Sequence, residues 1–276
     1  MITVGINNGI KSANSTGTLI TGEIKEAFKE AFDLILPFKC AVCGKVSDTE
    51  SRFPDYSDLY GQLYDAGPEL HICGQCLSSL VIQDEDHSWF YCLSNPVEND
   101  PCPGLALYLP FSYEGIVEKI IPKIKFGRQK ELARLFGVIL GSALQKEQFT
   151  ADLVVPIPLS GHRLKERGFN QAGEIAYPVA KMNNLPYAED CLIRKRDTGR
   201  QSEIRDIRLR EANVTGAFAV NDAWDVTDLK VIVIDDVATT GSTLHEAALA
   251  LYKAGASKVL CVAFAGNRQV KNAEPF

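Results

Sequence analysis

Two adjacent carboxylates, Asp235 and Asp236, directly follow an apolar run of β-branched residues, and hydroxyl side chains come next. Open α/β sheets bind ligands at the carboxyl ends of their strands. Gly241 permits a close backbone approach, and the free N–H groups of the following helix favour an anion. Because carboxylates accept hydrogen bonds from sugar hydroxyls, we expect a ribose 5-phosphate site, formed by Asp235, Asp236, Ala238, Thr239, Thr240, Gly241, Ser242 and Thr243.

Other classes of phosphate-binding protein fit this stretch poorly. The chain has no GxxxxGK[ST] segment, which a P-loop nucleotide triphosphatase requires, and no GxGxxG segment, which a dinucleotide-binding fold requires. In a phosphoacceptor receiver domain the paired acids lie near the beginning, whereas only 40 residues follow Asp236. A strand that ends in a polar turn without a ligand is the structural alternative.

The basic residues gather in the middle of the chain. The net charge is −6, but residues 119–210 carry +8, against −11 before them and −3 after them. Two basic segments stand out, at 163–167 and 194–200. They indicate a local site for an anion, such as a phosphate or the backbone of single-stranded nucleic acid. Solvated surface loops are the alternative, and charge alone does not separate the two.

Four cysteines form two C-x-x-C pairs, Cys40 with Cys43 and Cys73 with Cys76, separated by 29 residues. Four thiolates in two such pairs are ligands for tetrahedral zinc, and they leave no open position for catalysis. We therefore expect one structural zinc ion, with free thiols as the alternative. Cys92 and Cys102 lack complete pairs, and whether they hold a second metal stays open.

The remaining elements must position these groups. Apolar runs at 105–113, 153–158, 231–235 and 258–265 alternate with helical patterns at 116–124, 130–146, 170–182, 203–212 and 242–253. This alternation predicts an α/β domain whose parallel sheet is covered by helices on both faces. We divide the chain into a loose tail at 1–22, a helix and cysteine-rich zinc-ribbon module at 23–104, and the α/β domain at 105–276.

Composition places the chain among globular proteins. The 276 residues are 46% hydrophobic and 23% charged, which excludes collagen-like and wholly disordered chains. We find no apolar stretch long enough to span a membrane and no secretory signal pattern. Eight cysteines without an export signal favour a reducing compartment, so we expect a cytoplasmic protein.

Several segments together resemble a known family. Residues 231–243 resemble the phosphoribosyl-diphosphate (PRPP) motif of type I phosphoribosyltransferases. The chain is also similar to the ComF family of phosphoribosyltransferase-like competence proteins. The segments that carry this second resemblance are DLILPFKCAVCG at 33–44, KIKFG at 123–127, PIP at 156–158, RLKERGFNQA at 163–172, LIRKRDTGRQ at 192–201, R-x-x-N at 210–213 and GAF at 216–218.

The resemblance implies a type I phosphoribosyltransferase-like fold that binds PRPP with Mg²⁺. It places Pro158, Arg163, Arg167 and Asn170 in the loop that touches the pyrophosphate. It places Arg194, Lys195, Arg196 and Arg200 in a mobile loop that closes over the ligand.

The resemblance also implies a role in natural competence, with single-stranded DNA and competence proteins as partners. Two alternatives remain open. One is an active phosphoribosyltransferase of nucleotide salvage, for which we identify no pocket for a base. The other is a nucleic-acid or protein-binding adaptor whose PRPP site is vestigial. The fold alone does not establish catalysis.

Overall fold

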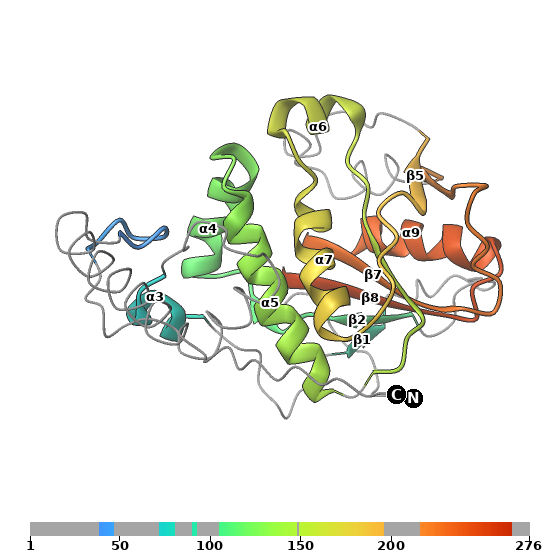
Figure 1. Cartoon of the computed structure of the whole chain (residues 1–276), viewed down its shortest axis with the longest axis horizontal. Coiled ribbons are helices and arrows are strands. Elements are labelled where there is room, and N and C mark those ends of the chain that lie inside the picture. Colours follow the sequence, from blue (N-terminus) through green and yellow to red (C-terminus); the bar gives the residue numbers. More distant parts are fainter. Residues whose placement is uncertain are drawn as a thin grey trace, which may run out of the picture.

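A mostly parallel β-sheet lies at the centre of the molecule (Figure 1). The computed structural model describes residues 39–46, 72–80, 90–92, 105–147, 149–195 and 216–266. Within these ranges the sheet has the order β1-β2-β8-β7-β4, with β3 also on β8, and β1 is the strand that runs antiparallel to its neighbour. The strands are β1 (Phe90–Cys92), β2 (Ala106–Tyr108), β3 (Phe111–Ser112), β4 (Leu153–Pro156), β7 (Lys230–Ala238) and β8 (Lys258–Gly266).

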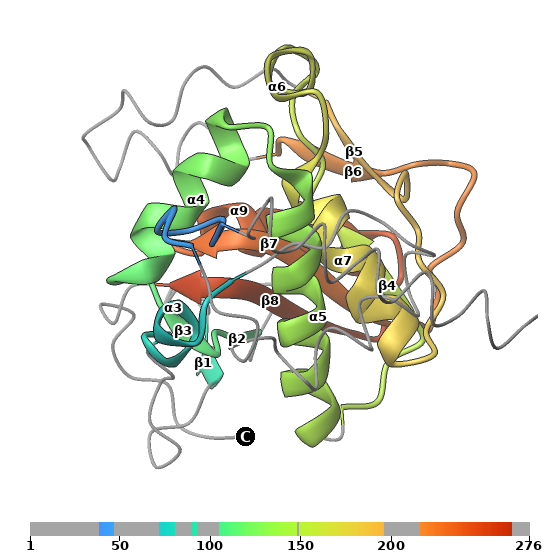
Figure 2. The same cartoon turned by 60° about the vertical axis from the view of Figure 1, so that its left-hand side comes forward.

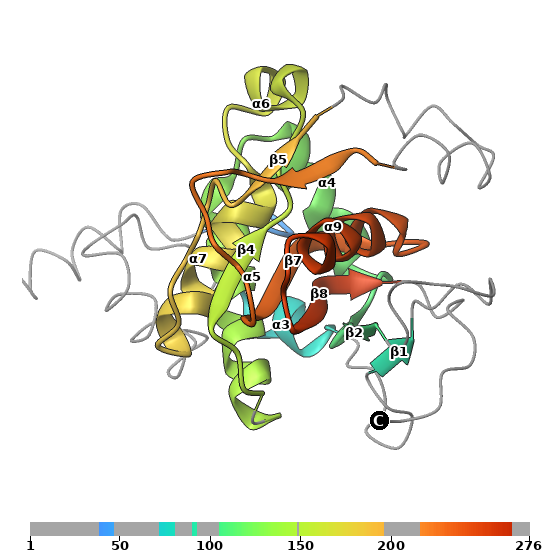
Figure 3. The ribbon, with the colours of Figure 1, turned by 90° about the vertical axis from the view of Figure 1, so that its right-hand side faces the viewer.

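Helices cover both faces of this sheet. Figure 3 shows α9 on one side of β7 and β8, and α5 and α7 on the other. Side chains of β7 alternate accordingly: Ile232 and Ile234 pack with α4, α5 and α7, whereas Val231 and Val233 pack with α9. The helices are α3 (Gly74–Ser78), α4 (Ile116–Phe126), α5 (Lys130–Lys146), α6 (Gly161–Arg167), α7 (Gln171–Met182) and α9 (Ser242–Lys253).

Helices α5 and α7 pack closely because glycines of α5 face α7. A Cβ atom added at Gly137 would lie 2.4 Å from the Ile175 carbonyl oxygen and 2.3 Å from Pro178 Cγ. Below this contact, the rings of Phe136 and Phe264 stack with centroids 3.8 Å apart. The close packing fixes α7, whose N-terminus leads out of the loop that follows β4.

Most of the expected elements are confirmed where the structure describes them. The helices expected at 116–124, 130–146, 170–182 and 242–253 are present, and the two C-terminal strands extend further than expected. The single strand expected at 105–113 is wrong: β2 and β3 are separate because the chain between them contains Pro110, which has no N–H to donate. The expected strand at 153–158 ends at Pro156.

Two elements of the α/β domain were not expected from the sequence. One is the short helix α6, which stands above the sheet in Figures 1 and 3. The other is a two-stranded antiparallel sheet of β5 (Leu192–Arg194) and β6 (Phe218–Val220). The helix expected at the start of the 23–104 module, the expected helix at 203–212 and the tail at 1–22 lie outside the described residues.

The cysteine-bearing segment 39–46 lies against α4, from which Lys123 Nζ donates to the Ala41 carbonyl oxygen (Figure 2). Cys40, Val42 and Ile72 are buried in the same hydrophobic cluster as the isoleucines of α4. The division of the chain at residues 22 and 104 stays a prediction. Among the described residues, no helix has the length and apolar composition needed to cross a membrane.

Candidate functional site

The acid pair lies near the carboxyl end of β7, the longest of the inner strands together with β8. Asp236 is buried, with 7% of its surface exposed, and Asp235 is half-buried. Neighbouring residues of a strand point to opposite faces, so the Asp235 and Asp236 side chains leave β7 on different faces of the sheet. The Asp236 backbone N–H donates to Asp235 Oδ1 over 2.8 Å, which holds the Asp235 side chain beside the strand.

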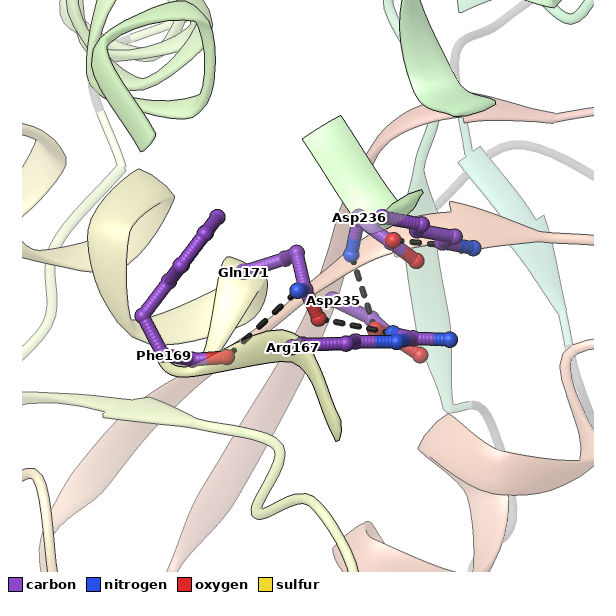
Figure 4. Close-up of polar contacts among 6 residues, drawn as sticks. Arg167, Phe169, Gln171, Asp235 and Asp236 are labelled. Carbon is purple, nitrogen blue, oxygen red and sulfur yellow. Dashed lines mark hydrogen bonds and ion pairs between the residues drawn. The ribbon is translucent and has the colours of Figure 1, made fainter. Parts of the chain in front are cut away.

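Two cations, one from α4 and one from α6, approach the acid pair. Lys125 Nζ, near the end of α4, lies 2.9 Å from Asp236 Oδ2. Arg167, at the end of α6, points toward the pair (Figure 4), and both carboxylates act on its charge. Arg167 Nη1 donates to Gln171 Oε1 over 2.7 Å, which orients the guanidinium. The result is a compact arrangement of two anions and two cations.

The electrostatics of the pair favour proton uptake by one carboxyl group. Burial and the neighbouring charge of Asp236 raise the pKa of Asp235 to about 7, although Lys125 and Arg194 act in the opposite direction. Burial lowers the pKa of the Arg167 guanidinium, and the two carboxylates partly offset that effect. Near neutral pH, Asp235 therefore exists both as an acceptor-only carboxylate and as a carboxylic acid that could donate.

The hydroxyl-rich turn joins β7 to α9 directly beyond the acid pair. Gly241 adopts a left-handed conformation with φ of 75°, and α9 begins after it without a side-chain cap among the described residues. The Thr240 and Ser242 hydroxyl groups are 2.7 Å apart, and Thr239 is exposed. The Ser242 N–H makes only a long hydrogen bond of 3.4 Å to Thr240 Oγ1, so the first N–H groups and the dipole of this 12-residue helix favour an anion at the turn. Ala238 is buried and Thr243 half-buried at the two ends of the turn.

The loop after β4 is held by local hydrogen bonds. The Ser160 hydroxyl caps α6 by accepting from the Arg163 N–H over 3.4 Å, and Gly168 ends the helix with φ of 85°. Asn170 Nδ2 donates to the Ile157 carbonyl oxygen over 3.0 Å. This last bond closes the base of the loop, because Ile157 and Asn170 are its first and last residues.

The structure divides the four loop residues expected to meet pyrophosphate between two sides. Arg167 faces the acid pair, whereas Pro158 and Asn170 line a cavity of about 870 Å³ that also includes Tyr177 and Tyr187. Arg163 is half-buried on α6. Arg167 therefore lies with Asp235 and Asp236, while Asn170 is placed to shape the loop.

Only part of the expected mobile loop is described. Arg194 lies in β5, with its guanidinium carbon 5.4 Å from the centroid of the Phe218 ring, and it acts on the charge of Asp235. The Lys195 N–H donates to the Ala217 carbonyl oxygen, and its side chain is exposed. Arg196 and Arg200 lie outside the described residues.

The four cysteines come together in one group, here called the cysteine cluster. The Sγ atoms of Cys40, Cys43, Cys73 and Cys76 all lie within 4.8 Å of one another, and those of Cys43 and Cys73 are 3.8 Å apart. Thiolates around tetrahedral zinc are about 3.8 Å apart, from a Zn–S length of about 2.3 Å, so the cluster fits this metal. Cys102 and the side chain of Cys92 are outside the described residues.

Ionisation within the cysteine cluster also suits a metal. Burial opposes ionisation of the Cys40 thiol, but N–H donors from Cys43, Cys73 and Val42 outweigh it and lower its pKa to about 6. Burial and the neighbouring thiols raise the pKa of Cys76. Metal ligation requires thiolates, and a thiol that ionises this easily provides a first ligand.

Lys125 and Gln171 were not expected at the site. Lys125 belongs to the KIKFG segment, whose resemblance was recognised without a role for any single residue. Its partner Asp236 is remote in sequence, so no local spacing could predict the pair. The one signal was the unusual placing of Lys123 and Lys125 between apolar residues of an amphipathic helix.

The chain is similar to one protein family and to several known proteins. The phosphoribosyl transferase domain family matches residues 139–274. The DNA utilization protein YhgH of Salmonella typhi is 31% identical over 164 residues, 58% of this chain and 71% of that protein. YhgH of Escherichia coli strain K12 is 27% identical over 228 residues, which cover 80% of this chain and 86% of that protein. Competence protein F of Haemophilus influenzae is 28% identical over 194 residues, which cover 68% of this chain and 81% of that protein.

These matches agree with the structure. The matched domain family includes β7, the acid pair and the turn into α9, and the parallel sheet flanked by helices confirms a type I phosphoribosyltransferase-like fold. The coverage of the relatives also reaches beyond that domain toward the N-terminus. The resemblance drawn from the sequence is confirmed, and the chain belongs to the ComF family of phosphoribosyltransferase-like competence proteins.

Proposed function

We propose that this protein binds PRPP together with Mg²⁺ at the carboxyl end of β7. The observation that carries the proposal is the acid pair beside the N-terminus of α9, within a segment that the phosphoribosyl transferase domain family matches. The two features suit the two ends of one ligand. Carboxylates accept hydrogen bonds from the ribose hydroxyls, and the turn at 239–243 receives the 5-phosphate.

The cations of the site suit the remaining part of the ligand. A diphosphate carries several negative charges, and Arg167 and Lys125 are the cations placed beside the acid pair. Bound Mg²⁺ would neutralise part of this charge on the diphosphate oxygens. Arg167 Nε is buried without a hydrogen-bond partner among the described residues, so the guanidinium is not fully satisfied by the protein.

A pair of variants tests this assignment. Replacing both acids, Asp235→Asn and Asp236→Asn, should abolish PRPP binding in the presence of Mg²⁺ as measured by calorimetry. Asp222→Asn removes an exposed carboxylate that belongs neither to the acid pair nor to the turn, and it should leave the affinity unchanged. Undiminished binding by the double variant would refute the assignment. If the protein also releases pyrophosphate from PRPP when one of a panel of bases is present, it is an active phosphoribosyltransferase.

We propose further that the protein handles single-stranded DNA in the cytoplasm during natural competence, together with competence proteins. The names of the relatives, DNA utilization protein and competence protein, support this role. A surface at the ends of α4 and α6 supports it as well. Phe126 is 69% exposed, and the Arg167 guanidinium carbon is 5.9 Å from the centroid of its ring. Arg128 Nη2 reaches the Glu166 carbonyl oxygen over 3.5 Å, which brings another cation to this surface.

An exposed aromatic ring among cations is what single strands require, because bases stack on the ring and cations pair with phosphates. Phe126→Ala should weaken binding of a labelled oligothymidylate by about 1–3 kcal/mol in a fluorescence anisotropy titration. Phe126→Trp should preserve binding, because tryptophan keeps a stacking surface. Equal loss of duplex and single-stranded binding in Phe126→Ala would count against a stacking role.

A further inference from the structure

Helix α4 connects the cysteine cluster with the acid pair through two lysines. Lys123 Nζ donates to the carbonyl oxygens of Ala41 over 2.9 Å and Val42 over 2.6 Å, which lie between the first two cysteines of the cluster. Two residues later, Lys125 Nζ lies 2.9 Å from the Asp236 carboxylate. One helical turn therefore makes polar contacts with both sites.

The two lysines lie in the last turn of α4, where apolar packing ends. The earlier turns are held by buried isoleucines, of which Ile124 is the last. Beyond it, Phe126 is 69% exposed and is the last residue of the helix, with Gly127 as the C-cap. Two residues of a helix rise by about 3 Å and turn by about 200°, so Lys123 and Lys125 leave opposite sides of the same turn, which links the two contacts rigidly. The position of this last turn thus depends on both polar contacts.

The acceptors of Lys123 are positioned by the cysteine cluster itself. Residues 39–46 form a small loop with an isolated bridge between Lys39 and Val46 and a hydrogen bond from the Cys40 N–H to the Lys45 carbonyl oxygen. A zinc ion would join this loop to the segment around Cys73 and Cys76. Small cysteine-rich segments of this kind take their stability from the metal. Metal loading should therefore decide how firmly the two carbonyl groups are held.

We propose that the metal-loaded cysteine cluster positions Lys125 over Asp236 through Lys123, so that zinc binding and PRPP binding are coupled. The inference rests on the proposed PRPP site. Lys125 keeps a positive charge beside the acid pair, where the anionic diphosphate of the ligand arrives. Lys123 acts through Lys125 and touches no ligand, so it is a positioning residue. Coupling is reciprocal, so PRPP should also strengthen retention of the metal.

Calorimetric titration of the zinc-loaded full chain with PRPP and Mg²⁺ tests the coupling. Lys123→Met keeps the aliphatic stem but removes the donor, and should raise the dissociation constant by about 5- to 10-fold. Lys123→Arg retains the charge and the donors and should restore most of the affinity. Lys119→Met, an exposed lysine one turn earlier in α4, should have no effect.

A double-variant cycle separates positioning from general damage. If Lys123 acts through Lys125, adding Lys123→Met to Lys125→Met should cause no further loss of affinity. Zinc transfer to a chelator should be slower with PRPP present in the wild type, and unaffected by PRPP in Lys125→Met. Independent, additive losses would overturn the coupling, as would wild-type affinity in Lys123→Met. No binding of PRPP by the wild-type chain would instead refute the proposed function.

Discussion

Replacing Asp235 with asparagine should make the ligand-free protein more stable, and the gain should depend on pH. The pKa of Asp235 is raised from 3.8 to about 7 by burial and by the charge of Asp236. The folded state therefore holds its proton more tightly than the unfolded chain. Stability falls as pH rises from the unfolded pKa to the folded pKa, because the ionised carboxylate is disfavoured only in the folded protein.

The size of the effect follows from the shift. Ionisation of Asp235 costs about 4 kcal/mol of folding free energy at pH 8 and about 2 kcal/mol at pH 5.5. Asparagine cannot ionise, and its Oδ1 can still accept the hydrogen bond from the Asp236 N–H. Asp235→Asn should thus exceed the wild type in stability by a margin that roughly doubles between these two pH values.

Urea unfolding of the zinc-loaded protein, with no PRPP present, measures this margin at both pH values. Asp222→Asn, which changes an exposed carboxylate, should leave the stability within about 0.5 kcal/mol of the wild type. A margin for Asp235→Asn that is the same at pH 5.5 and pH 8 would refute the reasoning. It would show that the carboxyl group titrates alike in the folded and unfolded chain.

Three further predictions follow from other features. PRPP affinity should rise as the pH increases through about 7, the pKa of Asp235, and calorimetry on Asp235→Asn should show no such rise from this group. Metal analysis of the purified protein should find about one zinc per chain, and a value near two would show that Cys92 and Cys102 contribute to a second site. Gly137→Ala should lower the unfolding free energy by about 1–3 kcal/mol, because its Cβ would overlap α7. Gly161→Ala, where the added Cβ meets no neighbour, should not be destabilising, and urea unfolding distinguishes the two.

The sheet could be predicted from the sequence because its inner strands are buried on both faces. Short apolar runs rich in β-branched residues, such as 231–234 and 258–265, are typical of strands buried on both faces of a parallel sheet. The same reasoning failed for 105–113, where the apolar pattern continues through Pro110 although the strand does not. The pair β5–β6 escaped notice because each strand has only three residues and its partner is distant in sequence.

The acid pair could be placed at the carboxyl end of a strand because the apolar run that forms the strand ends directly before it. The partners of the pair could not, since Lys125 and Arg167 reach it from helices whose packing depends on the whole fold. Asn170 illustrates the same limit. The family resemblance placed it in the loop that meets pyrophosphate, whereas its hydrogen bond to the Ile157 carbonyl oxygen is a contact that only the closed loop creates.

Because adjacent residues of β7 point to opposite faces, Asp235 and Asp236 belong to different hydrophobic layers. Asp236 meets α4 on the layer shared by α5 and α7, while Asp235 follows Val231 and Val233 on the layer of α9. A molecule that binds both carboxylates would therefore contact both faces of the sheet at the end of β7. Its binding should slow amide hydrogen exchange in the last turn of α4 and the first turn of α9 together, because these helix ends lie beside the two carboxylates.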